Sequence, residues 1–360
     1  MNCAFCPNRL DGSEEHIILN GLGGVRSSTR IICSICNQRF GNTIDKALLE
    51  ALEPYTLILD PPTRRQSIGT RKRLFDANGD EYEMTAGGKI KVRYKQIAPN
   101  QWIADVADTG HVTANTDAAA KALQERSGQP VSTNVSHGSR IPGPFNLQMR
   151  LDNFTAIRAL MKWALNLLAV EVLSGDDLQL AFPKIERDFV DKGIGEPLAG
   201  FLDRSLIPGM FGGLEHYVAL FRTSNGSVYW EASAYGGAIA AAGRTAPIET
   251  PFQATLYRVD PITGRYSTNA LTGDLLPDDF CLWVPTHDAT CLARTNVTSA
   301  RLTYEMNLRQ GRETIVDDCL KEHLPTEGAI TKQHTAAAAR CIGERFIALV
   351  RQLRESGMEP

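Results

Sequence analysis

Two pairs of cysteines near the start of the chain constrain its fold more than any other feature. Two residues separate the cysteines within each pair, and 26 residues separate the pairs. The four cysteines are Cys3, Cys6, Cys33 and Cys36. Four thiolates in two close pairs satisfy tetrahedral Zn²⁺ and leave no open position for a substrate, so a zinc ion bound there is structural. We predict that this ion supplies folding energy on the order of 10 kcal/mol to a small N-terminal segment. Four unrelated free thiols are the less favoured alternative.

Three residues suited to chemistry accompany the cysteines. Glu15 and His16 are adjacent between the two pairs, and Asn37 follows the last cysteine directly. On a strand, the side chains of Glu15 and His16 would point to opposite faces. One could then hold a hard cation such as Mg²⁺ while the other accepts a proton from an attacking water. Alone, a Glu-His pair is typical of a solvated surface and Asn37 is typical of a helix N-cap. Their placement beside the cysteine pairs favours the chemical interpretation.

The order of elements in residues 1–56 also suits a small metal-bound domain. A short strand is expected at 15–19, followed by a glycine-rich loop at 21–26 and then the second cysteine pair. A helix is expected from Asn37, and Pro54 is expected to end it. The apolar residues that recur at helical spacing in this segment are Phe40, Ile44, Leu48, Leu49 and Leu52.

Three short motifs in this segment carry a family resemblance. They are Glu15-His16-Ile-Ile, Gly23-Gly24 and Cys33-Ser-Ile-Cys36-Asn37. Over about residues 1–50 they resemble the HNH endonucleases, in the zinc-containing branch similar to phage recombination endonuclease VII. The resemblance implies a ββα-metal fold, Zn²⁺ on the four cysteines, and Mg²⁺ or Mn²⁺ as a second, catalytic ion. It further implies that His16 is the general base, that Glu15 and Asn37 ligate the catalytic metal, and that cleavage leaves 5′-phosphate and 3′-hydroxyl ends.

The chain departs from this family pattern at several positions. Leu19 stands where the family usually has proline, and Ser28 or Thr29 lies nearest to the middle asparagine of the family name. Gly41 stands where some members place another metal ligand. Asp45, further along the expected helix, is interpreted as a structural residue, with metal ligation as the less favoured alternative.

The next section, residues 57–148, is expected to be β-rich. Hairpin turns are indicated at 78–79 and 87–88, a helix at 118–123, and a linker or active loop at 128–148. The section also contains five cations in a window without an acidic residue. These are Arg64, Arg65, Arg71, Lys72 and Arg73. Such a cluster suits neutralisation of a nucleic-acid backbone, and a solvated basic loop is an equally favoured alternative.

The third section, residues 149–360, mixes helices and strands. An apolar stripe predicts a strong helix from about 153 to 174, and a second helix is expected at about 335–354. A hairpin turn is indicated at 225–226, and the small residues of 232–243 are consistent with either a strand or a loop. Strands are expected at 217–222, 228–231, 254–259 and 280–284.

These patterns predict an α+β chain. An N-terminal ββα-metal zinc finger at 1–56 is followed by the β-rich middle region at 57–148 and by a larger mixed α/β domain at 149–360. The net charge of −3 requires any contact with nucleic acid to depend on local positive charge. No apolar run reaches membrane-spanning length, and four further cysteines are scattered, so we expect a cytoplasmic protein without a membrane partner.

Three functions are compatible with these patterns. The favoured one is a metal-dependent endonuclease that hydrolyses DNA phosphodiester bonds, of the restriction or defence type found in bacteria and phages. Cleavage of both strands would call for a homodimer, and the region after the finger would provide recognition or control. The alternative is a zinc finger that binds nucleic acid without cutting it, which would have no need of Glu15 and His16. A third hypothesis is an effector whose C-terminal domain senses a ligand or a modified base and licenses the nuclease.

Overall fold

The computed structural model describes most of the chain, including the whole N-terminal segment and most of the C-terminal half. The described residues are 1–62, 72–75, 81–92, 94–98, 101–104, 153–171, 199–202, 204–245, 247–248, 250–273, 275–277, 283–284, 289–325 and 329–355. The expected turn at 78–79, the expected helix at 118–123 and the expected linker at 128–148 lie outside these residues.

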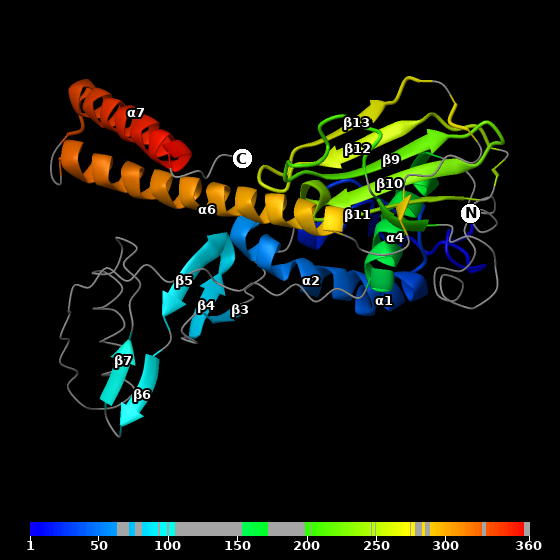
Figure 1. Cartoon of the computed structure of the whole chain (residues 1–360), viewed down its shortest axis with the longest axis horizontal. Coiled ribbons are helices and arrows are strands. Elements are labelled where there is room, and N and C mark those ends of the chain that lie inside the picture. Colours follow the sequence, from blue (N-terminus) through cyan, green and yellow to red (C-terminus); the bar gives the residue numbers. More distant parts are fainter. Residues whose placement is uncertain are drawn as a thin grey trace. The chain divides into compact units, whose positions relative to one another are not determined.

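The chain divides into two compact units, each assembled from distant parts of the sequence. The first unit contains Met1–Ser67, Met149–Met306 and Leu353–Pro360, and the second contains Ile68–Gln148 and Asn307–Gln352. Both helices and strands are present, as expected for an α+β chain (Figure 1). The three-domain division at 56/57 and 148/149 stays a prediction.

The first unit begins with two short strands and two helices. Strands β1 (Glu15–His16) and β2 (Ser27–Ser28) pair antiparallel, and a turn of 3-10 helix, η1 (Asn20–Leu22), lies between them. Helices α1 (Ser34–Asn42) and α2 (Ile44–Leu59) follow. This order of strand, strand and helix, with the four cysteines close together, is the predicted arrangement of a ββα finger.

The prediction of one helix ending at Pro54 is wrong in two respects. The helix is broken at Thr43, and Pro54 lies inside α2, which continues to Leu59. A proline inside a helix costs about 3 kcal/mol because a hydrogen bond is lost. The apolar stripe offsets this cost, since Tyr55 and Ile58 beyond the proline are also buried. Tertiary packing therefore overrides the local signal for a helix end.

An antiparallel sheet of seven strands forms the largest element of the first unit. Its strand order is β13-β12-β9-β10-β11-β8-β14 (Figure 1). The strands are β8 (Ala199–Leu202), β9 (His216–Arg222), β10 (Val228–Ala234), β11 (Ile239–Arg244), β12 (Thr255–Val259), β13 (Tyr266–Ala270) and β14 (Trp283–Val284). The four predicted strands are confirmed wherever the structure describes them. The turn at 225–226 is confirmed too, with Gly226 at φ +84°.

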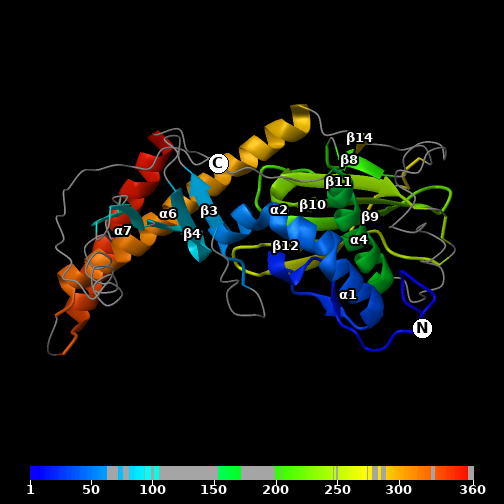
Figure 2. The same ribbon diagram turned by 90° about the horizontal axis from the view of Figure 1, so that it is seen from below.

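The small residues of 232–243, which the sequence leaves undecided, form the end of β10, a short turn and β11. Helix α4 (Asn153–Glu171) packs across this part of the sheet and also contacts α2 (Figure 2). The alanines at 240, 241 and 242 are buried. Small side chains here allow the helix to approach the sheet closely, and the central part of α4 is accordingly buried on all sides.

The second unit contains small sheets and parts of two long helices. Strands β3 (Lys72–Phe75), β4 (Glu81–Thr85) and β5 (Lys89–Val92) form one sheet, and β6 (Tyr94–Ala98) pairs with β7 (Gln101–Ala104). The turn η2 (Ala86–Gly88) joins β4 to β5 and confirms the hairpin signal at 87–88. Helix α6 (Ala289–His323) reaches into this unit, and α7 (Lys332–Glu355) confirms the helix expected near the C-terminus.

Two of the cysteines described as scattered are in fact paired, because a disulfide joins Cys319 of α6 to Cys341 of α7. Sequence spacing could not indicate this pair, since the two cysteines are 22 residues apart in the sequence and lie on different helices. Among the described helices, none is long and apolar enough to cross a lipid bilayer.

One buried acid in the sheet makes the stability of the first unit sensitive to pH. Glu231 of β10 is fully buried and accepts hydrogen bonds from Ser205 Oγ at 2.8 Å and from the main-chain nitrogen of Leu206 at 3.0 Å. Burial, the dominant cause, raises the pKa of Glu231 from 4.5 to about 7. The folded state therefore keeps this proton at pH values where the unfolded chain has lost it.

We expect Glu231→Gln to gain stability relative to the parent as the pH rises. The parent loses stability from about pH 4.5 up to about pH 7, because its raised pKa favours the protonated acid in the folded state only. This shift in pKa lowers the parent's free energy of unfolding by roughly 3 kcal/mol across that pH range. The variant has a neutral glutamine and does not undergo this loss. Urea unfolding of both proteins at pH 5 and pH 8 measures the difference. A constant offset between the two proteins at all pH values would contradict the assignment.

Candidate active site

The four N-terminal cysteines form a cluster that fits a zinc ion. Their sulfurs all lie within 4.8 Å of one another, and Cys6 Sγ lies 3.6 Å from Cys33 Sγ. A zinc ion with Zn–S bonds of about 2.3 Å requires sulfurs about 3.8 Å apart at the corners of a tetrahedron. The observed spacing matches this requirement. Four sulfurs close the coordination shell, so an ion held here would serve the fold and take no part in cleavage.

Main-chain hydrogen bonds hold the two cysteine pairs in place. The nitrogen of Cys3 donates to the carbonyl of Asn8 at 2.8 Å, and the nitrogen of Ala4 donates to the carbonyl of Ile31 at 2.9 Å. The second bond joins the first pair to the segment that precedes the second pair. Burial, as the largest cause, raises the pKa of Cys3 to about 11. A bound zinc ion would reverse this tendency, because it stabilises the thiolate.

Two glycines are required by the connection between β1 and β2. Gly23 has φ +87°, a conformation that side chains disfavour. A Cβ atom on Gly24 would lie 1.8 Å from the carbonyl oxygen of Ile18, which is a direct clash. The Gly23-Gly24 motif therefore permits the chain to return close to β1. In the resulting ladder Glu15 pairs with Ser28, and His16 pairs with Ser27.

Asn37 lies in the first turn of α1 and contacts the segment that leads into β1. Its Nδ2 donates to Ser13 Oγ at 2.9 Å and to the carbonyl of Glu14 at 3.0 Å. The alternative role of Asn37 as a helix N-cap is wrong, because α1 begins at Ser34 with Cys33 as its N-cap. Asn37 thus contacts the main chain of Glu14, which lies two positions before His16 in the sequence. His16 itself is half-buried.

Glu15 lies in a buried cluster with residues from other elements. Its Oε1 accepts a hydrogen bond from Lys162 Nζ at 3.1 Å, and Lys162 also forms an ion pair with Asp45 Oδ2 at 2.5 Å. Lys162 is fully buried, while Glu15 and Asp45 are 5% and 6% exposed. Burial raises the pKa of Glu15, and the ammonium of Lys162 opposes that shift. With all three groups ionised, two carboxylates share one ammonium, and the cluster carries net negative charge.

Lys162 and Asn166 of α4 were not singled out from the sequence, although one pattern could have indicated them. They are polar residues four positions apart in the buried part of the helix, residues 159–169, where all other residues are apolar. Asp45 has the structural contact that the sequence interpretation favoured, since its carboxylate binds Lys162. Asn166 Nδ2 donates to the carbonyl oxygen of His16 at 2.9 Å. Helix α4 therefore contacts both residues of β1.

The basic cluster cannot be placed beside this site. Arg64, Arg65 and Arg71 lie outside the described residues. Lys72 and Arg73 belong to β3, which lies in the second unit, and their side chains also lie outside the described part of the structure. Contact between these residues and nucleic acid stays a prediction.

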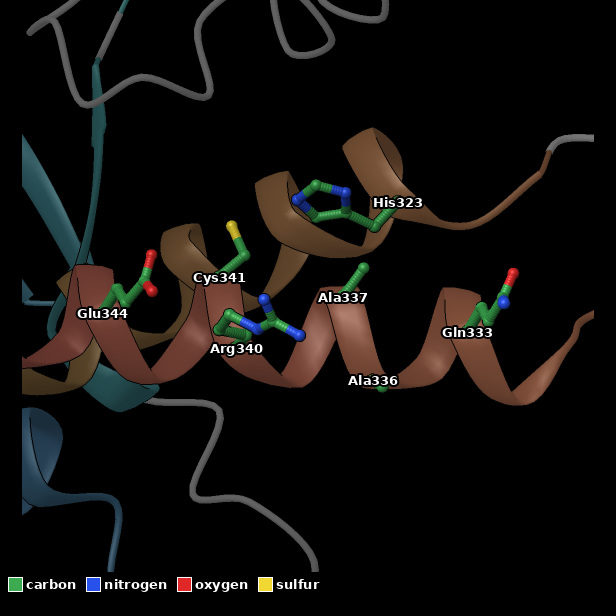
Figure 3. A pocket seen from close by; sticks show the side chains of 7 residues that line it. All are labelled: His323, Gln333, Ala336, Ala337, Arg340, Cys341 and Glu344. Carbon is green, nitrogen blue, oxygen red and sulfur yellow. The ribbon is translucent and has the colours of Figure 1, made fainter.

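A second group of potential ligands lies in the other unit, beside a cavity of about 390 Å³ (Figure 3). Glu322, His323 and Cys341 are close together there. Cys341 is bonded to Cys319, and Arg345 holds the Glu322 carboxylate through contacts of 2.7 and 2.8 Å. Two of the three groups are therefore already engaged, and we assign no metal to this position.

Comparison with known proteins agrees with the geometry of the finger. Residues 3–53 match the family model described as HNH endonuclease. No curated protein and no solved structure matches the chain significantly. The matched segment contains the four cysteines, both strands, α1 and most of α2, and it ends long before α4. The N-terminal segment of the chain, residues 3–53, is therefore similar to the HNH endonuclease family, as the sequence motifs predict.

Proposed function

We propose that the chain is a metal-dependent endonuclease that hydrolyses phosphodiester bonds of DNA. The observation that carries the proposal is the buried cluster around Glu15. Glu15 and Asp45, two carboxylates of the segment that matches the HNH family, share the single ammonium of Lys162 from α4. With all three groups ionised, the negative charge that the ammonium leaves uncompensated suits a divalent cation. The next residue, His16, is half-buried and has the proton-accepting group that the reaction needs.

In the proposed reaction the protein residues have separate tasks. His16 accepts the proton of the attacking water as general base. Glu15 and Asn37 ligate Mg²⁺ or Mn²⁺, with Asn37 offering Oδ1 because its Nδ2 donates to Ser13 and Glu14. The ion, when bound, stabilises the charge that develops on the phosphate. Cys3, Cys6, Cys33 and Cys36 hold structural Zn²⁺ and keep the helix that carries Asn37 beside β1.

The wider role is part of the same proposal. We place the protein in the cytoplasm, where a reducing environment keeps the zinc-binding thiols available but also works against the bond between Cys319 and Cys341. A restriction or defence function in a bacterium or phage fits a nuclease whose small finger is joined to a much larger body. Cleavage of both strands would require a homodimer, since one finger provides one site. Sensing of a ligand or modified base by the region after the finger stays a hypothesis.

The direct test is cleavage of supercoiled plasmid by the purified full-length protein. We expect nicked or linear product with Mg²⁺ or Mn²⁺, and no product in a buffer without either ion until one of them is added. Zinc content should remain at one ion per chain throughout, which separates the structural metal from the catalytic one. Absence of cleavage with either ion, on unmodified and modified DNA alike, would reject the proposal.

A non-catalytic zinc finger that binds nucleic acid is the second candidate. The contacts of Glu15 with Lys162 favour it, because they give the carboxylate a purely structural partner. This candidate predicts DNA binding in a gel-shift assay with no cleavage in any divalent ion. It further predicts that His16→Ala binds DNA as the parent does, so the same panel of assays separates the two functions.

A further inference from the structure

Two polar side chains interrupt the apolar surface of α4, and both reach the strand that carries His16. Lys162 and Asn166 are four residues apart, so they lie on one face of the helix, and both are fully buried. Asn166 contacts the carbonyl oxygen of His16 across a sequence separation of 150 residues. Neither residue belongs to the segment that matches the HNH family. The support for β1 therefore comes from a part of the chain that the family pattern does not include.

The contacts of these residues with Glu15 are made at a single oxygen. Lys162 Nζ lies 3.1 Å from Glu15 Oε1, and Asn166 Nδ2 lies 3.4 Å from the same atom. Both donors therefore engage Oε1, and neither of them donates to the second oxygen, Oε2. Carboxylates that ligate metals are commonly oriented in this way, by hydrogen bonds from neighbouring groups to the carboxylate.

We infer that Lys162 and Asn166 are positioning residues for the catalytic metal and for His16, and this inference rests on the proposed nuclease function. Together they orient Glu15 so that Oε2 ligates the divalent ion. Asn166 also holds the main chain of His16 in place, so that the imidazole keeps a constant position relative to the carboxylate of Glu15. Helix α4 thus forms part of the cleavage centre, in addition to any role in recognition.

A purely structural explanation accounts less well for these contacts. A buried ammonium and a buried amide each cost free energy, and apolar residues of similar size would pack the helix at least as well. Both polar groups converge on Glu15 and His16, the two residues that the HNH motif predicts to be functional. Lys162 lies in addition 5.4 Å from the ring centre of Phe40, in the helix that carries Asn37.

The experiment compares full-length parent protein with Asn166→Leu and Asn166→Ala. Both substitutions remove the donor to Glu15 and His16 but leave the Lys162 ion pairs in place, and the two differ in how they fill the site. Leu160→Val is the matched control, because residue 160 lies on the opposite face of the same buried helix. For each protein we would measure zinc content, thermal stability, the Mn²⁺ concentration that gives half-maximal cleavage, KM for DNA, and Mn²⁺ binding by electron paramagnetic resonance.

We expect both Asn166 variants to require 10- to 100-fold more Mn²⁺ than the parent, with unchanged zinc content and unchanged KM for DNA. The control should keep the parent's Mn²⁺ requirement at a comparable loss of thermal stability. If the variants cleave with the parent's metal dependence and rate, the inference is overturned while the nuclease function stands. If the parent does not cleave at all, the nuclease function fails and Mn²⁺ binding decides: equal binding by parent and variants overturns the positioning role, and at least tenfold weaker binding by the variants supports it.

Discussion

Replacing Cys36 with serine is expected to unfold the N-terminal finger and abolish cleavage. Cys36 is 1% exposed and is one of four sulfurs within 4.8 Å of one another. Three sulfurs and a hydroxyl bind zinc much more weakly, and zinc binding at such sites contributes on the order of 10 kcal/mol to folding. Because the four cysteines hold α1 beside β1, loss of the ion would separate Asn37 from the segment that it contacts.

Three measurements on Cys36→Ser test this expectation. The zinc content should fall from one ion per chain to near zero. Limited proteolysis should cut residues 1–42 quickly, while the seven-stranded sheet stays protected. Plasmid cleavage should be lost even with excess Mg²⁺ or Mn²⁺. The control is Cys341→Ser, which removes a cysteine from the second unit and should retain zinc and cleavage. A Cys36→Ser protein that keeps zinc and a protease-resistant finger would contradict the assignment of the four sulfurs.

The second large effect concerns His16. We expect His16→Ala to lower the rate of cleavage by roughly 100- to 10,000-fold, which is the usual contribution of a positioned general base. His16 is a half-buried residue of a two-residue strand, and removal of its side chain should leave the zinc site and the fold intact. Loss of rate should therefore appear without loss of zinc or of thermal stability, and KM for DNA should stay near the parent's value.

The matched control for this prediction is His334→Ala, which removes another half-buried histidine, at the start of α7 in the second unit. That variant should cleave at the parent's rate. If His16→Ala retains more than about a tenth of the parent's activity, another group must accept the proton. If it loses activity together with zinc or stability, His16 is a structural residue of the finger.

Local sequence patterns predicted the finger well because its geometry depends on spacing. The close cysteine pairs bring four sulfurs together through tight turns, and Gly23-Gly24 allow the return to β1. Strand alternation and a hairpin turn likewise predicted β9 and β10. The order of the seven strands, by contrast, depends on pairings between distant segments, which no local pattern specifies. The extension of α2 past Pro54 was missed for the same reason, since its residues Tyr55 and Thr56 contact Tyr235, which lies far away in the sequence.

The candidate site was only half predictable. Glu15, His16 and Asn37 were found because a family motif marks them in the first 50 residues. Lys162 and Asn166 were missed because periodicity shows which face of a helix is apolar, but it does not show which partner a buried polar group will meet. The contact of Lys162 with Glu15 spans 147 residues and emerges from the packing of the whole first unit.

The bond between Cys319 and Cys341 gives the protein two sets of sulfurs with opposite needs. The N-terminal thiols must stay reduced to bind zinc, whereas the sulfurs of α6 and α7 are oxidised. The covalent link closes a loop with a sequence separation of 22 residues. Because it lowers the conformational entropy of the unfolded chain, it adds roughly 3 kcal/mol to the free energy of unfolding. Excess dithiol during purification would therefore protect the finger and at the same time release α7 from α6. A preparation without reductant would preserve that link but expose the thiols of the finger to oxidation, so one choice of reductant acts on the two sets of sulfurs in opposite ways.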